Sequence, residues 1–202
     1  MALRLACATA NPGKLAELAA ILAAAGDIEL LPRPAEVPTV VENAGTLVGN
    51  ARLKAAAVAA ATGLPAIADD TGLEVAALDG APGVETASFA GEGASDEENW
   101  SQLLRELEGV ADRRATFRTV AMVVWPDGRE VWSEGTCAGR IAGAHRGEAG
   151  FGYDSVFVPD AGDGRSFAEF SAPEKEAISH RGKALAALLG KLRQAGEVAG
   201  RR

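Results

Sequence analysis

Short apolar segments alternate with longer segments of helical periodicity over the first third of the chain. The apolar segments have the length of buried strands, whereas the longer ones repeat leucine, isoleucine and alanine at helical spacing. We therefore predict strands and helices in alternation, over residues 3–9, 14–25, 28–31, 46–62 and 66–68. Gly26 and Gly63 stand where glycine commonly ends a helix.

The middle of the chain is typical of extended structure. The strand predicted at 66–68 ends in the polar residues 69–72, and a separate strand is predicted over residues 73–78. Pro126, Asp127 and Gly128 separate two apolar segments, which predicts a hairpin. The two strands of this hairpin are expected over residues 115–125 and 130–141.

Helix-start signals mark the second half of the chain. Ser95 precedes three acids, a pattern typical of an N-cap, and predicts a helix that ends near Leu107. Ser171 and Glu174 match a capping box, and the helix that they open is expected to break near residues 179–182. A last amphipathic helix follows, and residues 197–202 are expected to be frayed.

This order of elements predicts an α/β fold with a central mixed sheet flanked by helices. The 202 residues are enough to bury a sizeable core without disulfides or a structural metal. No internal repeat or low-complexity linker interrupts residues 1–202. We expect a single domain, in which any second lobe is an insertion in the sheet.

Charge and cysteine content exclude several classes of protein. The formal net charge is −8, whereas nucleic-acid scaffolds usually carry a basic surplus, so we expect no nucleic-acid partner. No window of about 18 uninterrupted apolar residues occurs and the N-terminus lacks a signal-peptide pattern, so we expect no membrane association. Cys7 and Cys137 lie far apart in the sequence, which favours a protein without disulfides in the reducing cytoplasm.

The segment between the first strand and the first helix is a candidate phosphate site. Free backbone N–H groups and the helix dipole favour an anion there, and Lys14 adds a positive charge. The spacing differs from that of a P-loop, because Leu15 follows the lysine. The alternative is a strand–turn–helix joint with an exposed lysine. The candidate residues are Thr9, Ala10, Asn11, Pro12, Gly13 and Lys14.

Two adjacent carboxylates, Asp69 and Asp70, follow an apolar strand, where burial without partners is unfavourable. Successive strand residues point to opposite sides, so one carboxylate can face a cleft while backbone donors hold the other. A carboxylate in a cleft can bind Mg²⁺ or accept a proton from water. Glu42, in a polar loop, could form with Asp70 the pair of carboxylates typical of Mg²⁺ sites in nucleotide enzymes. An Asp-rich turn and a solvated surface acid are the alternatives.

Phe151, Gly152 and Tyr153 are candidates for binding a base. Two exposed aromatic rings separated by a glycine can stack on a base, and Asp154 beside them can accept hydrogen bonds from base N–H groups. The alternative is an aromatic hairpin corner.

Four basic side chains are candidates for contacts with a substrate. Lys54 lies on the second predicted helix, and Lys175 lies on the helix that the capping box opens and can reach a phosphate. The helix break after Lys175 is expected to expose His180 and Arg181, whose donors can read a carbonyl oxygen on a base. The alternatives are a solvated helix lysine and a basic helix end that pairs with the helix dipole.

Taken in order, these segments resemble the inosine triphosphate pyrophosphatase family, also called the non-canonical purine NTP pyrophosphatases. The resemblance extends from Ala8 to about Leu189. The segments that carry it are Thr9–Lys14, Ala68–Leu73, Gly80–Val84, Phe151–Asp154 and Ser179–Arg181.

The resemblance implies an elongated subunit of two lobes with a substrate cleft between them, and a cytosolic homodimer that depends on Mg²⁺. It implies cleavage of a purine nucleoside triphosphate, such as ITP, dITP or XTP, to the monophosphate and pyrophosphate. Asp70 matches the family's general base, and Glu42 and Asp70 match its metal ligands. The positions that match its substrate contacts and base pocket are Thr9–Lys14, Thr71, Phe151–Asp154, Lys175, His180 and Arg181.

The chain departs from the usual family pattern at Glu85 and Ser88, where an aromatic residue and an arginine are common. Two alternatives stay open: a nucleotide- or RNA-binding module without hydrolysis, and a pyrophosphatase that acts on other bases. The pair of Asp70 and Glu42 favours hydrolysis, because a pure binder gains nothing from acids near a phosphate.

Overall fold

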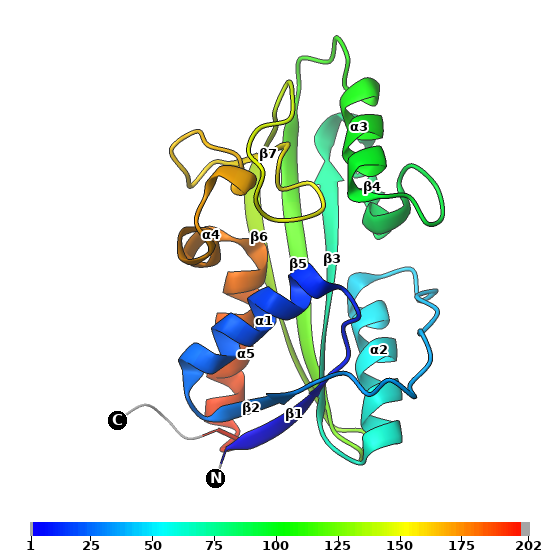
Figure 1. Ribbon diagram of the computed structural model, residues 1–202, viewed down its shortest axis with the longest axis vertical. Coiled ribbons are helices and arrows are strands. Elements are labelled where there is room, and N and C mark those ends of the chain that lie inside the picture. The colour runs from blue at the N-terminus through cyan, green and yellow to red at the C-terminus, as the bar shows by residue number, and fades with distance from the viewer. Residues whose placement is uncertain (1, 199–202) are drawn as a thin grey trace. The chain divides into compact units, whose positions relative to one another are not determined.

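The strands pair into one mixed sheet in the order β2-β1-β3-β5-β6-β7, with β4 paired to β3. The computed structural model in Figure 1 describes residues 2–198. Strands β2 and β3 are each parallel to β1, whereas β4 is antiparallel to β3 and β7 is antiparallel to β6. The strands are β1 (Leu3–Cys7), β2 (Ile28–Leu31), β3 (Ala66–Val75), β4 (Pro82–Gly83), β5 (Arg114–Val124), β6 (Glu130–Ile141) and β7 (Phe157–Pro159).

Helices connect and flank these strands. Within residues 2–198, no helix has the length and apolar character needed to cross a membrane. The α-helices are α1 (Pro12–Ala25), α2 (Leu47–Thr62), α3 (Asp96–Glu106), α4 (Ala172–Ile178) and α5 (His180–Gln194). Short 3₁₀ turns lie at Ala76–Leu78, Thr86–Ser88 and Phe167–Glu169.

Two units can be distinguished in the described chain. Unit 1 comprises residues 2–70, 119–135 and 181–198, and unit 2 comprises Thr71–Arg118 and Thr136–His180. Strands β3, β5 and β6 contribute residues to both units. The single domain expected over residues 1–202 and the cleft expected in it stay predictions.

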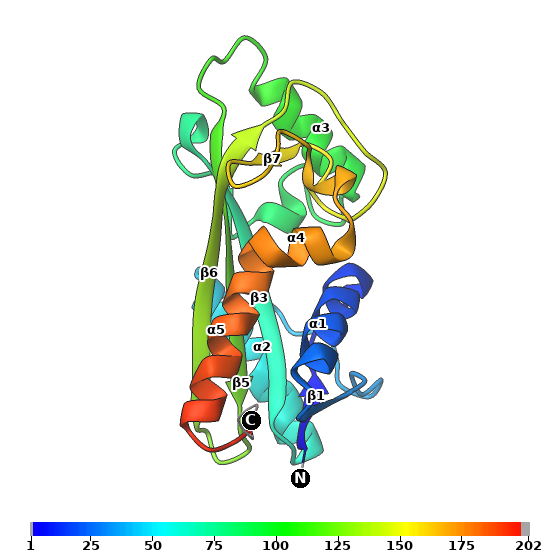
Figure 2. The same cartoon turned by 90° about the vertical axis from the view of Figure 1, so that its left-hand side faces the viewer.

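Alternation along β1 and β3 sorts the side chains of unit 1 onto two faces of the sheet. Leu5, Cys7 and Ile67 pack with apolar residues of α1 and α5, such as Leu18 and Leu185. The alanines between them pack against the alanine-rich α2. Figure 2 shows α1 and α5 on one side of these strands and α2 on the other. The same alternation positions the charged residues described below.

Local signals set the ends of α1 and α2. The side chains of Asn11 and Thr46 each accept a hydrogen bond from the first turn of the helix that follows them. Gly26 and Gly63 end the two helices with φ angles of 85° and 66°, in the left-handed region that favours glycine. The C-terminal ends agree with the predicted ones, whereas α1 begins at Pro12, two residues before its predicted start.

Unit 2 has its own apolar core, in which Leu73, Leu103 and Phe157 are buried. Helix α3 begins with the predicted cap at Ser95. The Ser95 hydroxyl accepts from the N–H of Glu98 at 3.2 Å, and the Glu98 carboxylate accepts from the N–H of Ser95 at 2.7 Å. This reciprocal capping fixes the start of the helix that carries Leu103 into the core.

The predicted α/β class, with a central mixed sheet flanked by helices, is confirmed. The prediction of two separate strands on either side of residues 69–72 is wrong, because β3 runs without interruption from Ala66 to Val75. The polar residues do not end the strand, since side chains from both faces of the sheet compensate their charges.

The prediction of a frayed end from residue 197 is wrong for Glu197 and Val198, the two residues of this end that the structure describes. Val198 is buried in the core of unit 1, and the Glu197 carboxylate lies 2.8 Å from the guanidinium of Arg129. The expectation for residues 199–202 lies outside the described residues.

The core of unit 2 predicts a difference between two leucine substitutions on helices. Leu103 is fully buried, so Leu103→Ala should lower the free energy of unfolding by about 2–5 kcal/mol. The same change at Leu53 of α2, which is 37% exposed, should lower it by less than about 1 kcal/mol. Urea denaturation of both variants measures the difference, and equal losses would show that the packing around Leu103 is misassigned.

Candidate active site

The alternation of β3 continues into its polar part and separates two adjacent carboxylates. Asp69 follows Ile67 on the face toward α1 and α5, whereas Asp70 follows Ala68 on the face toward α2. Both are buried, with 2% and 6% of their surfaces exposed. A buried carboxylate needs charged or hydrogen-bonding partners, so each face of the sheet has to supply them.

Arg181 and Lys14 supply the positive charge that faces Asp69. Nε of Arg181 donates to Oδ2 of Asp69 at 3.0 Å, and Nζ of Lys14 lies 3.7 Å from the same oxygen. Nη1 of Arg181 donates to the carboxylate of Glu17 on α1. The guanidinium at the start of α5 is therefore held by carboxylates from β3 and α1.

The expectation that a helix break exposes His180 and Arg181 is wrong. The break exists, since α4 ends before Ser179 and α5 begins at His180, but His180 and Arg181 are only 3% and 2% exposed. The imidazole packs in unit 2 against Phe117, with ring centroids 4.4 Å apart. The guanidinium is buried because Asp69 and Glu17 compensate its charge.

The ionisation of Asp69 follows from this environment. Burial alone would raise the pKa of its carboxyl group, but the charges of Lys14 and Arg181 outweigh burial and hold the pKa of Asp69 far below its usual range. Burial also lowers the pKa of Lys14, although Asp69 attracts its ammonium. Asp69 is therefore a permanent counter-charge, and a further anion near Lys14 would favour the charged form of the lysine.

Lys54 of α2 bridges Asp70 and Glu42 on the other face. Its Nζ lies 2.7 Å from Oδ1 of Asp70 and 2.8 Å from Oε2 of Glu42. Burial raises the pKa of Asp70 and outweighs the lowering by the Lys54 ammonium. Of the two adjacent acids, Asp70 is therefore the one that accepts a proton more readily.

The pair of Asp70 and Glu42 fits the predicted Mg²⁺ site. One oxygen from each carboxylate points at a single ammonium, so the two already share one cation. Mg²⁺ is commonly bound by one or two carboxylates together with substrate phosphates and water. No three His, Cys, Asp or Glu side chains gather as a metal site among residues 2–198, so oxygens from outside the protein would have to complete the coordination.

The predicted phosphate segment forms the capping turn of α1. Oγ1 of Thr9 accepts from the N–H of Asn11 at 3.2 Å, and Oδ1 of Asn11 accepts from the N–H of Lys14 at 3.0 Å. Because the end of β1 pairs in parallel with the start of β3, with Cys7 opposite Ile67, the segment that follows β1 lies beside Asp69. In this stretch Thr9 is buried, Gly13 and Lys14 are half-buried, and Ala10, Asn11 and Pro12 are exposed.

Asp154 is the polar centre of the aromatic segment in unit 2. Its carboxylate accepts from the N–H of Phe151 at 3.0 Å and from the ammonium of Lys175. The ammonium also lies 5.0 Å from the ring centre of Phe151 and 5.6 Å from that of Phe167. Lys175, for which a phosphate contact was predicted, is 7% exposed and serves here as the counter-ion of Asp154.

Two further contacts fix the backbone of this segment. The N–H of Gly152 donates to the carboxylate of Asp96 at 2.6 Å, and Gly152 has a φ of 60°, which favours glycine. The hydroxyl of Tyr153 donates to the carbonyl of Thr86 at 3.0 Å. The prediction of two exposed aromatic rings is wrong for Tyr153, which is 3% exposed, whereas Phe151 is half-buried.

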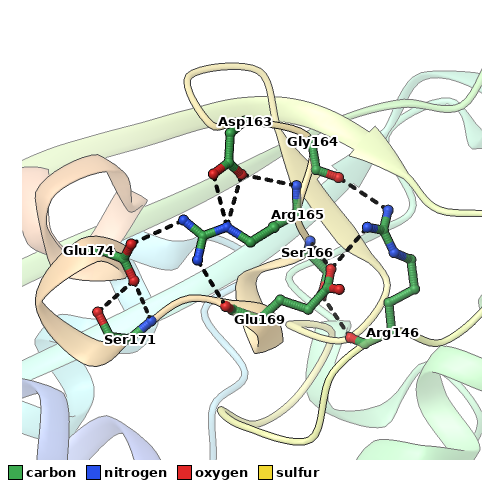
Figure 3. A network of polar contacts seen from close by, with 8 residues as sticks. All are labelled: Arg146, Asp163, Gly164, Arg165, Ser166, Glu169, Ser171 and Glu174. Atoms are coloured by element: carbon green, nitrogen blue, oxygen red, sulfur yellow. Dashed lines mark hydrogen bonds and ion pairs between the residues drawn. The ribbon is translucent and has the colours of Figure 1, made fainter.

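A network of polar contacts holds the chain at the start of α4 (Figure 3). The guanidinium of Arg165 donates to the carboxylate of Glu174 at 3.0 Å, and the same carboxylate accepts from the N–H of Ser171 at 2.8 Å. The second contact belongs to the predicted capping box, which the structure confirms. Because Lys175 follows Glu174 directly, the network helps to position the lysine.

Glu17 and Asp96 were not identified from the sequence. Glu17 stands three residues after Lys14, so both lie on one face of α1, and that spacing indicates that they belong to one charged cluster. Asp96 looks like an ordinary first-turn acid of a helix. No local pattern indicates its contact with Gly152, which lies 56 positions further along the chain.

The chain is similar to known proteins of one family. Residues 5–191 match the model of the Ham1 family. The chain is 46% identical over 196 residues to a dITP/XTP pyrophosphatase of Streptomyces coelicolor, an alignment that covers 95% of this chain and 98% of that protein. It is 47% identical over 190 residues to one of Thermus thermophilus, with 93% and 90% covered. Its fold is similar to that of a HAM1 protein from Coxiella burnetii, with a TM-score of 0.85, 39% identity and coverage of 95% and 99%.

The burial of Arg181 predicts a large stability difference between two arginine substitutions. Arg181→Met should lower the free energy of unfolding by about 3–5 kcal/mol, because it leaves Asp69 and Glu17 without their shared cation. The control is Arg4→Met, because the Arg4–Glu29 pair is more than half exposed and should contribute at most about 1 kcal/mol. Similar losses in the two variants, measured by urea denaturation, would contradict the assigned role of Arg181.

The network before α4 predicts a pKa that an NMR titration can measure. Arg165, followed by Ser171, lowers the pKa of Glu174 to about 2, so the charged carboxylate favours the folded state until the pH falls toward that value. Arg165→Ala should raise this pKa toward the usual value of about 4.3. Arg146→Ala is the control, because Arg146 contacts Glu169 and the carbonyl of Gly164, and it should leave Glu174 unchanged. An unshifted Glu174 in Arg165→Ala would refute the network.

Proposed function

Because the chain belongs to the Ham1 family, we propose that it hydrolyses deaminated purine nucleoside triphosphates such as dITP, XTP and ITP. The products are the nucleoside monophosphate and pyrophosphate. The observation that carries this proposal is the different environment of two adjacent acids. Asp69 pairs with the buried guanidinium of Arg181, whereas Asp70 shares the ammonium of Lys54 with a second carboxylate.

The charged cluster of unit 1 supports binding of a triphosphate. A nucleoside triphosphate is strongly anionic, and lysine side chains stabilise phosphate oxygens even in an acidic protein. Lys14 and Lys54 supply the charge, and the capping turn at Thr9–Lys14 lies beside Asp69 at the start of α1, where the free end of a helix favours an anion. The cluster consists of Lys14, Glu17, Glu42, Lys54, Asp69, Asp70 and Arg181.

Glu42 and Asp70 are the residues that would hold Mg²⁺. When bound, the ion would polarise a phosphoryl oxygen and offset the charge that develops on it. The oxygens of these two carboxylates lie close enough together to accept hydrogen bonds from the same ammonium group, that of Lys54.

Asp70 has the properties of a general base. Its raised pKa brings it closer to the range in which a carboxylate can take a proton from water at neutral pH. The water oxygen forms a bond to the α-phosphorus, its proton passes to Asp70, and the bond between the α-phosphorus and pyrophosphate breaks. Asp69 is unsuited to this step, since Lys14 and Arg181 hold its pKa far below the usual range despite burial.

Unit 2 supplies the residues that we assign to the base. Phe151 offers a half-buried ring, and Asp154 and His180 offer polar groups in an aromatic setting. Lys175 and Thr71 complete the proposed substrate contacts. Arg181 contributes by holding Asp69 and Glu17, in place of the exposed base-reading donor expected from sequence.

The same proposal includes a homodimer in the cytoplasm, without nucleic acid or membrane as a partner. The net charge of −8 supports the exclusion of these two partners, because an acidic protein is repelled by nucleic acids and anionic membrane surfaces.

A panel of nucleoside triphosphates in Mg²⁺, with products identified by ³¹P NMR, tests the proposal. We expect dITP, XTP and ITP to yield monophosphate and pyrophosphate well ahead of ATP, GTP and UTP. Release of orthophosphate would place the cleavage at another bond, and equal turnover of ATP would remove the base preference. Binding without turnover would favour a non-hydrolytic binding module.

The role of Glu42 predicts an altered metal dependence. Glu42→Gln should raise the Mg²⁺ concentration needed for half-maximal rate by about tenfold or more, because it removes one of two charged ligands. Glu29→Gln is the matched control, since Glu29 pairs with Arg4 at an exposed position, and its metal titration should equal that of the wild type. Superimposable titrations of all three proteins would remove Glu42 from the metal site.

A further inference from the structure

Lys54 occupies the position at which the two proposed metal ligands converge. Its ammonium lies 2.7 Å from Oδ1 of Asp70 and 2.8 Å from Oε2 of Glu42, and its side chain is 11% exposed. Hydrogen bonds of this length are strong when they join a charged ammonium to a carboxylate, and Lys54 makes two of them.

A single lysine cannot keep both contacts when a divalent cation enters. The two carboxylate oxygens that Lys54 contacts are donors that a hard cation also requires. An ammonium close to them neutralises part of their charge and repels a second cation. Metal binding to these carboxylates therefore competes with Lys54, as long as the ammonium has no other anion to contact.

We propose that Lys54 is a place-holding cation, which pairs Glu42 with Asp70 in the free protein and is drawn to a phosphate oxygen when nucleotide binds. This inference rests on the proposed function and deepens it. The consequence is coupled binding, in which the triphosphate removes the competitor of the metal and the two ligands favour each other.

Lys14 provides the internal comparison for this role. Its ammonium lies 3.7 Å from Asp69, on the opposite face of β3, and it contacts neither Glu42 nor Asp70 as an ion pair. Removing Lys14 deletes the same unit of charge from the cluster but leaves the position between the two metal ligands filled. A general electrostatic effect and a place-holding effect therefore predict different results.

The test is a titration of Mn²⁺ into the protein without nucleotide. Binding is measured by calorimetry or by electron paramagnetic resonance of the free ion. Lys54→Met should bind Mn²⁺ at least about tenfold more tightly than the wild type, a factor within the range of coupling typically found between two sites. Lys14→Met should show a clearly smaller gain. The gain of Lys54→Met should disappear when Glu42→Gln is added, because the vacated ligand pair is then incomplete.

Equal or weaker Mn²⁺ binding by a folded Lys54→Met protein would overturn the proposal, as would an equal gain in Lys14→Met. Near-UV circular dichroism checks the fold, and Lys54→Gln is the second variant. If neither variant folds, the Mn²⁺ titration of the wild type decides. A micromolar dissociation constant for Mn²⁺ without nucleotide would contradict a place-holding role of Lys54, and a millimolar one would support it. The hydrolysis panel on wild-type protein is independent of these titrations. Turnover of dITP without tighter Mn²⁺ binding in the variants would refute the place-holder alone.

Discussion

Asp69 and Asp70 are buried at successive positions of β3, and their charges have to be compensated from opposite faces of the sheet. This requirement explains why cations reach the strand from three helices. Lys14 of α1 and Arg181 of α5 serve one face, and Lys54 of α2 serves the other. Removing one partner of such a buried pair is far more unfavourable than removing an exposed ion pair.

The same geometry gives two chemically identical side chains different roles. Asp69 faces two cations and stays ionised, so it contributes a fixed charge that stabilises Arg181 and Lys14. Asp70 shares its cation with Glu42 and has a raised pKa, so it can exchange one cation for another and accept a proton. One step along the strand therefore separates an acid with a fixed charge from the acid that we propose as the general base.

Local signals in the sequence predicted most of the elements. The cap at Ser95 and the glycines that end α1 and α2 act on residues close to them in the chain, and such patterns are visible in the sequence. The continuity of β3 could not be predicted in this way, because two acids followed by threonine and glycine resemble a turn. Only partners distant in sequence make an extended strand favourable there.

The candidate site was predictable in its residue types more than in its contacts. The phosphate segment and the pair of Glu42 and Asp70 could be identified from position and chemistry. The burial of Arg181 could not, because its partner Asp69 lies 112 positions away and no local pattern indicates which of several acids it meets. The burial of Tyr153 was missed for a similar reason, since its hydroxyl partner belongs to a loop 67 positions earlier.

Comparing Asp69→Asn with Asp70→Asn tests the division of roles between the two adjacent acids. For each variant, the free energy of unfolding and kcat for dITP would be measured on the same preparation. We expect Asp69→Asn to lose about 3 kcal/mol of stability while its folded form keeps kcat within about tenfold of the wild type. Asp70→Asn should keep its stability within about 1 kcal/mol, because Lys54 still pairs with Glu42 and burial already disfavours the charge of Asp70, but it should lose about 10²-fold or more in kcat. The opposite pattern, or parallel losses in both variants, would show that the two acids do not divide these roles.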